Sequence, residues 1–591
     1  MVLFLFLGVS SQKLRANLYG ALLNYLHIMF RSGLVDNTQA GSNDNTSVNC
    51  LDSSRRHISL TKITSDQRTP TMDILVSAGD CLLQFLCLDC IGGHNICKLL
   101  ALSCVNMLID LDPHVSWITF LSMRGYIRNL IDSLMDSDVK LISVLETAPE
   151  TLGPLYIYES KMALLCRIAA TRTGSELLLE QGALACLSSM QVFDRHPDIK
   201  TLSTDASMDF YPSISSRYMQ ILFPALNFFD AILTSLGTKN QSCTAQVLHF
   251  LMSHNDTVNL VLHSGSPYIQ LIFLKELARI TCIISRASQQ DVWLVCDPED
   301  AWATQLHRMQ QLMLALFPSF VVSQGLFQEL SGAQEGGDAH NSEVVESVLW
   351  FFRIACNLVL FARNIVASQG VDHRATRVIF RPMLGETRTV DSRFRGEFHN
   401  SGSSDPPNLG VVVKQLVQCV EHHIREKASL EFLGRKLAFL PSMNATEMKE
   451  FLPEATTKTC TLAETCALAE QQLESRISNK KQELQHCMYL IENCLYLLWS
   501  HLDYYMLRAI PRTKFGLSYA KSVSEGYATP LTESAWKVTM EDISALKQGL
   551  VNTFSDSFSK KLLDIAQIGA TAILVTRMSA HKALFWGEAM A

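Results

Sequence analysis

Three cysteines and a histidine are the residues of this sequence whose types and proximity best suit chemistry. Cys87, Cys90, His94 and Cys97 lie close together, and thiolate and imidazole groups are ligands that zinc accepts. Their spacing fits no common zinc motif, and steps of three and four residues place all four on one face of a continuous helix. Because free cysteine is often a small buried apolar residue, we predict core packing and no metal. A metal-dependent or cysteine enzyme centred on these residues is the alternative.

The remaining motifs give no support to catalysis. His422 and His423 are adjacent, so on a helix they point in different directions and cannot bind one metal ion together. We expect both to be exposed on a helix surface. The sequence contains no His-Glu-x-x-His, phosphate-loop, Gly-x-Gly-x-x-Gly or Gly-x-Ser-x-Gly pattern. We therefore predict no catalytic residue, no cofactor and no metal, and a protein that is not an enzyme.

One stretch is strongly basic, and it precedes a segment rich in serine and proline within residues 369–410. A nucleic-acid site needs basic groups on a rigid face with aromatic platforms, but Phe380, Phe394 and Phe398 are widely spaced. The chain also has a net charge of −7, which provides no global attraction for nucleic acid. We predict a solvated linker and no direct nucleic-acid binding. The basic residues are Arg374, Arg377, Arg381, Arg388, Arg393 and Arg395.

An apolar seam near the C-terminal end is the best candidate for partner binding. Its residues recur three and four positions apart and include Met488, Ile491, Leu495, Leu498, Leu502 and Tyr505. Such a seam must pack against neighbouring helices or a partner helix. Large amphipathic rings often anchor partners, so the candidate partner-binding residues are Trp499, Leu502, Tyr504 and Tyr505. The sequence leaves open whether the seam is core or docking surface.

The elements that position these residues are predicted to be helices. Of the 591 residues, 48% are hydrophobic and 18% charged, with only 28 Gly and 17 Pro, a balance typical of packed helices. The 17 cysteines lie mostly in apolar stretches and indicate a reducing compartment. The longest apolar stretch, Tyr218–Leu236, contains Pro224, Asn227 and Asp230. We therefore interpret it as a buried helix and predict no transmembrane segment.

The helices are expected to form a stack. We predict an N-terminal helix within residues 1–35, a disordered loop at 36–71, a helical solenoid at 72–368, the linker loop at 369–410 and a second helical region at 411–591. The helices are short and apolar on one side, so each needs neighbours to bury that side. The fold class is thus all-α, a stacked-helix α-solenoid similar to HEAT and armadillo repeats, with disordered loops between helices. The apolar face of the first helix comprises Leu14, Leu18, Ala21, Leu22, Tyr25 and Leu26.

A recurrent corner supports the solenoid. An apolar residue stands four positions before a glycine that begins the next helix, and we expect that glycine to adopt a left-handed conformation. In three of the four cases a leucine follows five residues later and faces the stack. The corners are Leu121/Gly125, Leu178/Gly182, Val261/Gly265 and Val321/Gly325, and the leucines are Leu130, Leu187 and Leu330.

Several longer sequence segments resemble those of a known family. They include Leu155-Tyr-Ile-Tyr-Glu-Ser-Lys-Met-Ala-Leu-Leu, Arg217-Tyr-Met-Gln-Ile-Leu-Phe-Pro-Ala-Leu, Ala231-Ile-Leu-Thr-Ser-Leu-Gly and Gln246-Val-Leu-His-Phe-Leu-Met-Ser-His-Asn-Asp-Thr. Together with Ser11-Gln-Lys-Leu-Arg-Ala-Asn-Leu-Tyr-Gly-Ala-Leu-Leu, they are similar to the C-terminal part of the nucleoporin 205 family, the giant inner-ring scaffold nucleoporins. The likeness is clearest between residues 11 and 285. Members are much longer, so the resemblance implies a fragment.

The resemblance implies a structural subunit of the inner ring of the nuclear pore complex, located at the nuclear envelope and supporting assembly and nucleocytoplasmic transport, including that of protein and mRNA. It implies partners among other nucleoporins. These are inner-ring subunits and linker nucleoporins, notably a partner of about ninety-three kilodaltons, whose helical segments lie in solenoid grooves. A soluble helical-repeat nuclear transport receptor or adaptor is the alternative, because it shares the architecture and differs in being mobile.

Overall fold

The structure is a computed structural model, and it forms two compact units, residues 1–260 and 261–591. It describes residues 11–35, 79–111, 116–197, 211–237, 240–288, 301–323, 338–367, 379–384, 407–444, 448, 462–509 and 540–566. The loop predicted at 36–71 lies outside these residues, and the predicted domain boundaries remain predictions. Each unit is described separately below.

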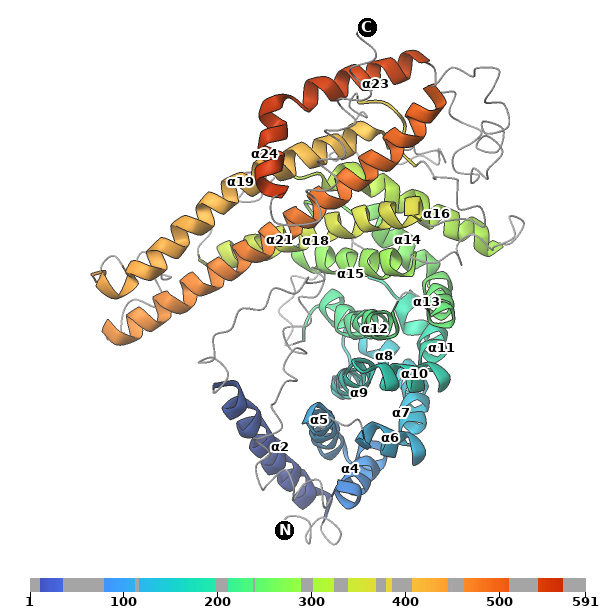
Figure 1. The fold of residues 1–591 in the computed structure, drawn as a ribbon. Coiled ribbons are helices and arrows are strands. Elements are labelled where there is room, and N and C mark those ends of the chain that lie inside the picture. Colours follow the sequence, from blue (N-terminus) through green and yellow to red (C-terminus); the bar gives the residue numbers. More distant parts are fainter. Residues whose placement is uncertain are drawn as a thin grey trace. The chain divides into compact units, whose positions relative to one another are not determined.

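The first unit is a stack of helices (Figure 1). In chain order it contains α2 (Gln12–Val35), α4 (Gly79–Gly92), α5 (Asn95–Leu111), α6 (Ser116–Met123), α7 (Tyr126–Met135), α8 (Asp138–Val144), α9 (Gly153–Ala169), α10 (Arg172–Glu180), α11 (Ala183–Ser189), the 3-10 helix η3 (Gln191–Asp194), α12 (Ile214–Leu236), α13 (Gln241–Ser253) and most of α14 (Asn255–Ser264).

Two rows of helices run through this unit. In one row α5 packs on α9 and α9 packs on α12, and in the other α4 packs on α7, α7 on α11 and α11 on α13. Contacts of α4 with α5 and of α12 with α13 join the rows. The central helix α9 buries Leu155, Tyr158, Met162, Leu165 and Ile168. Because helices such as α5, α9 and α12 each contact two or more neighbours, the stack provides the burial that a short helix cannot provide alone.

The first helix presents a different face from the predicted one. Tyr19, Leu22 and Leu26 are buried, whereas Leu14, Ala21 and Tyr25 are exposed, so the prediction was wrong for these three. A buried carboxylate explains the rotation. Asp89 of α4 accepts hydrogen bonds from the Tyr19 hydroxyl at 2.8 Å and from Arg15 Nε at 2.7 Å. Burial opposes the ionisation of Asp89, but these two bonds outweigh it and lower its pKa.

The glycine corners are confirmed at two positions. Gly125 and Gly182 have φ of 72° and 76° and immediately precede α7 and α11, and Leu130 and Leu187 are buried. The prediction was wrong for Gly265, which lacks a positive φ; a Cβ there would lie 2.8 Å from Leu316 Cδ2, so close packing is what favours glycine. The Val321/Gly325 corner, with Leu330, lies beyond the described residues.

The second unit is also helical. It contains α15 (Leu271–Ala287), α16 (Ala301–Leu316), the 3-10 helix η6 (Phe317–Phe320), α18 (Asp338–Ala367), α19 (Leu409–Phe439), the 3-10 helix η8 (Leu440–Ser442), α21 (Leu462–Ala509), α23 (Met540–Thr553) and α24 (Asp556–Ala566). The helix α15 packs on α18, α18 on α21 and α21 on α19. In Figure 1 the far ends of α19 and α21 extend beyond α18 as a two-helix hairpin.

Both units confirm the all-α fold class. Across the described ranges the only extended pairing is the isolated bridge between Arg381 and Asn408. Two helices, Ile214–Leu236 and Glu343–Ala367, are long and apolar enough to cross a membrane by length and composition alone. About half of each is buried among its neighbours, as in the core helix of a globular stack. The predicted absence of a transmembrane segment remains a prediction.

Substitutions of two glycines test the conformational role of the corner. We expect Gly182→Ala to lower the free energy of unfolding by about 1 kcal/mol, because a Cβ is disfavoured in the left-handed region. Gly20→Ala, at a position of α2 where an added Cβ meets no atom within 4 Å, should raise it by roughly 0.5–1 kcal/mol. Denaturant unfolding of both variants measures the difference, and equal effects would contradict the assigned corner.

Candidate partner-binding site

The predicted partner-binding residues lie on the last turns of α21, and the structure separates them into two groups. Tyr505 is 1% exposed and belongs to the core, together with Leu495 and Leu498. Trp499, Leu502 and Tyr504 are half-buried. The seam is therefore largely core in this unit, and only these last three retain surface that a partner could contact.

Tyr505 is buried because it holds a short segment of the same chain, residues 379–384, which we term the strap. Its hydroxyl donates a hydrogen bond to the carbonyl of Phe380 at 2.7 Å. His501, one turn earlier, accepts hydrogen bonds at Nε2 from the N–H groups of Ile379 and Phe380, at 3.1 and 3.3 Å. Its Nδ1 lies 2.7 Å from the carbonyl of Leu497. This arrangement requires a neutral imidazole with its proton on Nδ1.

The strap corrects one interpretation of the basic stretch. Ile379 and Phe380 are buried, and the Phe380 ring contacts His501 and Phe317 with centroids 5.2 and 5.5 Å apart. A solvated linker is therefore wrong for these residues. The sequence prediction was based on the many arginines of this stretch and overlooked the apolar side chains of Ile379 and Phe380 between them. Of the six arginines, the structure describes Arg381, whose backbone N–H donates to the carbonyl of Pro407 at 3.1 Å.

The base of the α19–α21 hairpin holds a buried polar cluster, and it overturns the prediction that His422 and His423 are exposed. Both are buried. His422 Nε2 lies 2.6 Å from Glu483 Oε1. Lys480 then joins the two helices, with Nζ 2.8 Å from Glu483 Oε2 and 2.7 Å from Glu426 Oε2. Burial opposes ionisation of Glu483, but the bonds from His422 and Lys480 hold its pKa below the ordinary value.

Two further histidines of the same unit, His486 and His501, are buried. Burial, aided by nearby Arg353, lowers the pKa of His486 to about 4, and its ring stacks on Phe352. Burial also lowers the pKa of His501 to about 4, although the bond to Leu497 opposes that shift. Both imidazoles are therefore neutral near pH 7. They act as uncharged packing and hydrogen-bonding groups.

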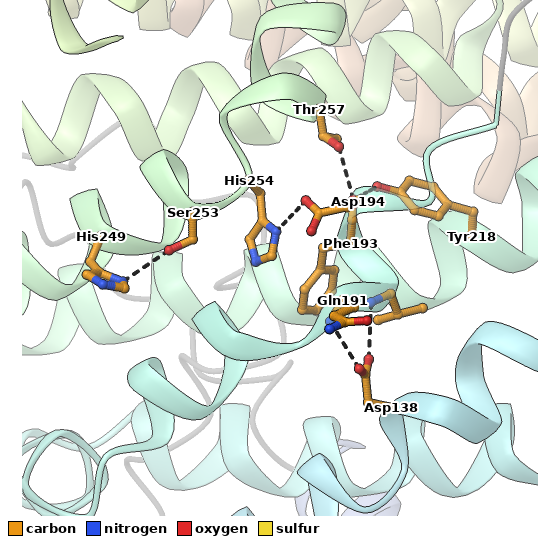
Figure 2. Close-up of polar contacts among 10 residues, drawn as sticks. Asp138, Gln191, Phe193, Asp194, Tyr218, His249, Ser253, His254 and Thr257 are labelled. Carbon is orange, nitrogen blue, oxygen red and sulfur yellow. Dashed lines mark hydrogen bonds and ion pairs between the residues drawn. The ribbon is translucent and has the colours of Figure 1, made fainter. Parts of the chain in front are cut away.

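In the first unit, the polar side chains converge on η3 (Figure 2). The Asp138 carboxylate accepts hydrogen bonds from the N–H groups of Gln191 and Val192, at 3.0 and 3.1 Å. The carbonyl of Phe193 accepts from the Tyr218 and Thr257 hydroxyls at 2.8 and 3.1 Å. These bonds connect η3 to α8, α12 and α14.

The end of η3 carries a histidine–carboxylate pair. His254 Nδ1 lies 2.7 Å from Asp194 Oδ1, and Figure 2 shows His249 meeting Ser253 beside it. The Phe193 and Phe250 rings pack edge-on against His254. The pair therefore joins the end of η3 to the turn between α13 and α14.

Two buried cations were not found by sequence reasoning. Lys161 donates to the carbonyl of Ser133 at 2.9 Å, and burial lowers its pKa to about 8. Arg217 donates to the carbonyls of Val144, Glu146 and Pro212. Each cation satisfies carbonyls at or near the end of a neighbouring helix. The sequence feature that could have identified them is a positively charged residue within an otherwise apolar helix face.

The three cysteines of the candidate metal site lie in the core, on two different helices. Cys87 and Cys90 lie on α4 and Cys97 on α5, all buried, whereas His94 is exposed between the helices. The prediction of one continuous helix was wrong, because the chain turns at Gly93. Burial raises the pKa of Cys87 to about 12 and that of Cys97 to about 11, so both thiols are protonated. Among the described residues, no group of three potential ligands could hold a metal ion.

These features define a helical scaffold whose buried polar groups fasten helices together. Comparison with known proteins shows what the chain is similar to. Residues 6–288 match the family described as nuclear pore complex scaffold, nucleoporins 186/192/205. The chain is 30% identical to Drosophila melanogaster nuclear pore complex protein Nup205 over 567 residues, which are 95% of this chain and 26% of the relative.

Two other relatives agree. Human Nup205 is 29% identical over 595 residues, covering 94% of this chain and 28% of the relative, and Chaetomium thermophilum nucleoporin NUP192 is 23% identical, covering 35% and 13%. The chain therefore spans about a quarter of the Nup205 proteins it matches. It is a relative of the nucleoporin 205 family of nuclear pore scaffolds, as the sequence words indicated. That family is structural, in agreement with the prediction that the chain is not an enzyme.

The buried histidines predict acid sensitivity. The unfolded chain takes up their protons near pH 6.5, but the folded state resists protonation until about pH 4. Their effect is absent above pH 6.5, and the free energy of unfolding falls as the pH drops below it, by about 2 kcal/mol per histidine near pH 5. Denaturant unfolding at several pH values measures this slope. His486→Gln should reduce it, and a constant free energy between pH 6.5 and 5 would contradict the assignment.

A second prediction concerns η3. Asp138→Ala removes two charge-assisted bonds and leaves buried N–H groups unpaired, so we expect a loss of about 2–3 kcal/mol in unfolding free energy. Hydrogen exchange at Gln191 and Val192 should accelerate. The matched control is Asp132→Ala, which removes only an exposed ion pair with Arg128 and should cost at most about 0.5 kcal/mol. Similar losses in both variants would refute the role of Asp138.

Proposed function

We propose that this chain is a structural scaffold segment of the nuclear pore complex inner ring, where it binds linker nucleoporins through its helical surfaces. The observation that carries the proposal is the relationship to Nup205 along 95% of the chain. Because the chain spans only part of those relatives, the ring position and the partners are inferences. Residence at the nuclear envelope and support of nucleocytoplasmic transport follow from this role.

The described side chains support a binding and not a catalytic role. Several buried titratable groups are held by intramolecular hydrogen bonds, as with Asp138, Glu483 and Lys161. The cysteine thiols discussed above are protonated and packed among apolar side chains. Such groups hold helices in place. What the fold offers to other molecules is surface.

We infer that the linker-binding surface includes Trp499, Leu502 and Tyr504 at the end of α21. These side chains are half-buried beside the core residues Leu498 and Tyr505, so a docked helix would contact anchors supported by a rigid base. Half-buried aromatic side chains next to a core are common binding anchors. Tyr505 would contribute by holding the strap, without touching the partner.

The cellular role is tested by mobility. The fluorescently tagged full chain should concentrate at the nuclear rim and recover slowly after photobleaching, as expected for a ring subunit. Rapid exchange with nucleoplasmic and cytosolic pools would favour the transport receptor or adaptor instead. A uniform distribution with no rim signal would contradict both assignments.

The binding surface is tested by substitution. Trp499→Ser combined with Leu502→Ser should weaken binding to a purified linker nucleoporin of about ninety-three kilodaltons by at least about tenfold, because truncated anchors cost 1–2 kcal/mol or more. Calorimetry measures the affinity, and the unfolding midpoint should change little. Gln471→Ser, exposed on α21, is the matched control. Unchanged binding, or unfolding of the double variant, would refute the surface.

A further inference from the structure

The distal half of α19 carries an exposed apolar stripe that no contact within the fold requires. Ile424, Phe432 and Phe439 are 41%, 51% and 64% exposed. With Ala428 and Arg435, both exposed, they fall within an arc of about 80° on the helix and span about 22 Å along it. We term these five residues the outer stripe. Solvent-facing aromatic residues at helical spacing are the pattern of a helix–helix interface.

The other helix of the hairpin lacks such a stripe. The exposed side chains of the distal half of α21 are mainly polar and include Glu464, Glu470, Gln471, Glu474 and Lys481. Ordinary exposure on a projecting hairpin therefore does not explain the outer stripe, because both helices project together (Figure 1). The asymmetry assigns a role to one face of α19.

The hairpin itself is thinly packed in this region. Between His423 and Leu440, no residue of α19 is buried. The buried polar cluster of His422 and Glu483 closes one end of this span. A small apolar cluster that includes Leu440 and Leu473 closes the other. A further helix laid on the outer stripe would supply the apolar contact that the pair lacks.

The charges around the outer stripe favour a second copy of the same helix. On one edge, Glu431 and Arg435 stand four residues apart and are both exposed. On the other edge, Arg425 lies 3.5 Å from Glu426, and Lys436 Nζ lies 4.8 Å from the Phe432 ring centroid. Neither a wholly acidic nor a wholly basic partner helix would match the edge of Glu431 and Arg435, which carries both signs. An antiparallel copy of α19 would match it.

We propose that two copies of this chain associate through the outer stripes of α19, antiparallel about a two-fold axis near Phe432. In that register Phe432 meets Phe432 of the second copy, and Ile424 meets its Phe439. Glu431 pairs with Arg435 of the second copy, and symmetry creates the same ion pair twice. An interface of this kind is isologous and self-complementary. It is independent of the surface proposed for linker nucleoporins.

Sedimentation equilibrium of the full chain tests the proposal. The contact is small, so the expected dissociation constant is about 10–100 µM, and the mass should rise toward twice 66.0 kDa with concentration. Phe432→Ser combined with Phe439→Ser should remain monomeric with an unchanged unfolding midpoint, since both side chains are exposed. A wild-type chain that stays monomeric at about 200 µM, well above that range, or a double variant that still dimerises, overturns the proposal.

A charge exchange tests the antiparallel register. Arg435→Glu should weaken the dimer about fivefold to tenfold, because it replaces two attractions with two repulsions. Adding Glu431→Arg in the same chain re-forms both pairs with reversed signs and should restore wild-type association. Gln471→Ser on the polar face of α21 is the control and should not alter the mass. Failure of the second charge change to restore association would refute the register.

Discussion

The need of each short helix for neighbours shapes this protein. A helix of ten to twenty residues with one apolar side gains little stability alone, and here α9 is stabilised because α5 and α12 cover it within the first unit. The longer helix α18, of 30 residues, likewise buries its apolar side by packing on α15 and α21 in the second unit. Stacking therefore follows from burial of surface. The faces left over at the edges of a stack become the places where other chains can bind.

Stacked apolar faces alone would leave the angle and register of the helices loosely defined, and buried polar groups fix them. Asp138 holds η3 by two N–H groups, and His501 holds the strap by two more. In both cases the side chain accepts hydrogen bonds from backbone N–H groups that have no hydrogen-bond partner within a helix. Leaving such groups unpaired costs free energy comparable to a lost hydrogen bond, so only one placement of the segment is stable.

A fold in which apolar faces stack the helices and buried polar groups fix their positions suits a scaffold. The buried charges and thiols described above are paired or neutral, as the raised pKa of Cys87 illustrates. The half-buried rings at the end of α21 lie on a helix whose inner face is anchored. A surface of this kind binds without reorganising, which reduces the entropic cost of association.

The sequence by itself determined the helical class, the left-handed glycine corners at Gly125 and Gly182, and the family resemblance. These depend on local preferences and on residue patterns within a few turns. The tertiary structure decided what local pattern could not. It turned the first helix toward Asp89, buried His422 against Glu483 and folded Phe380 onto Tyr505. Each outcome depends on a partner 60 or more residues away, and such a partner leaves no trace in local periodicity.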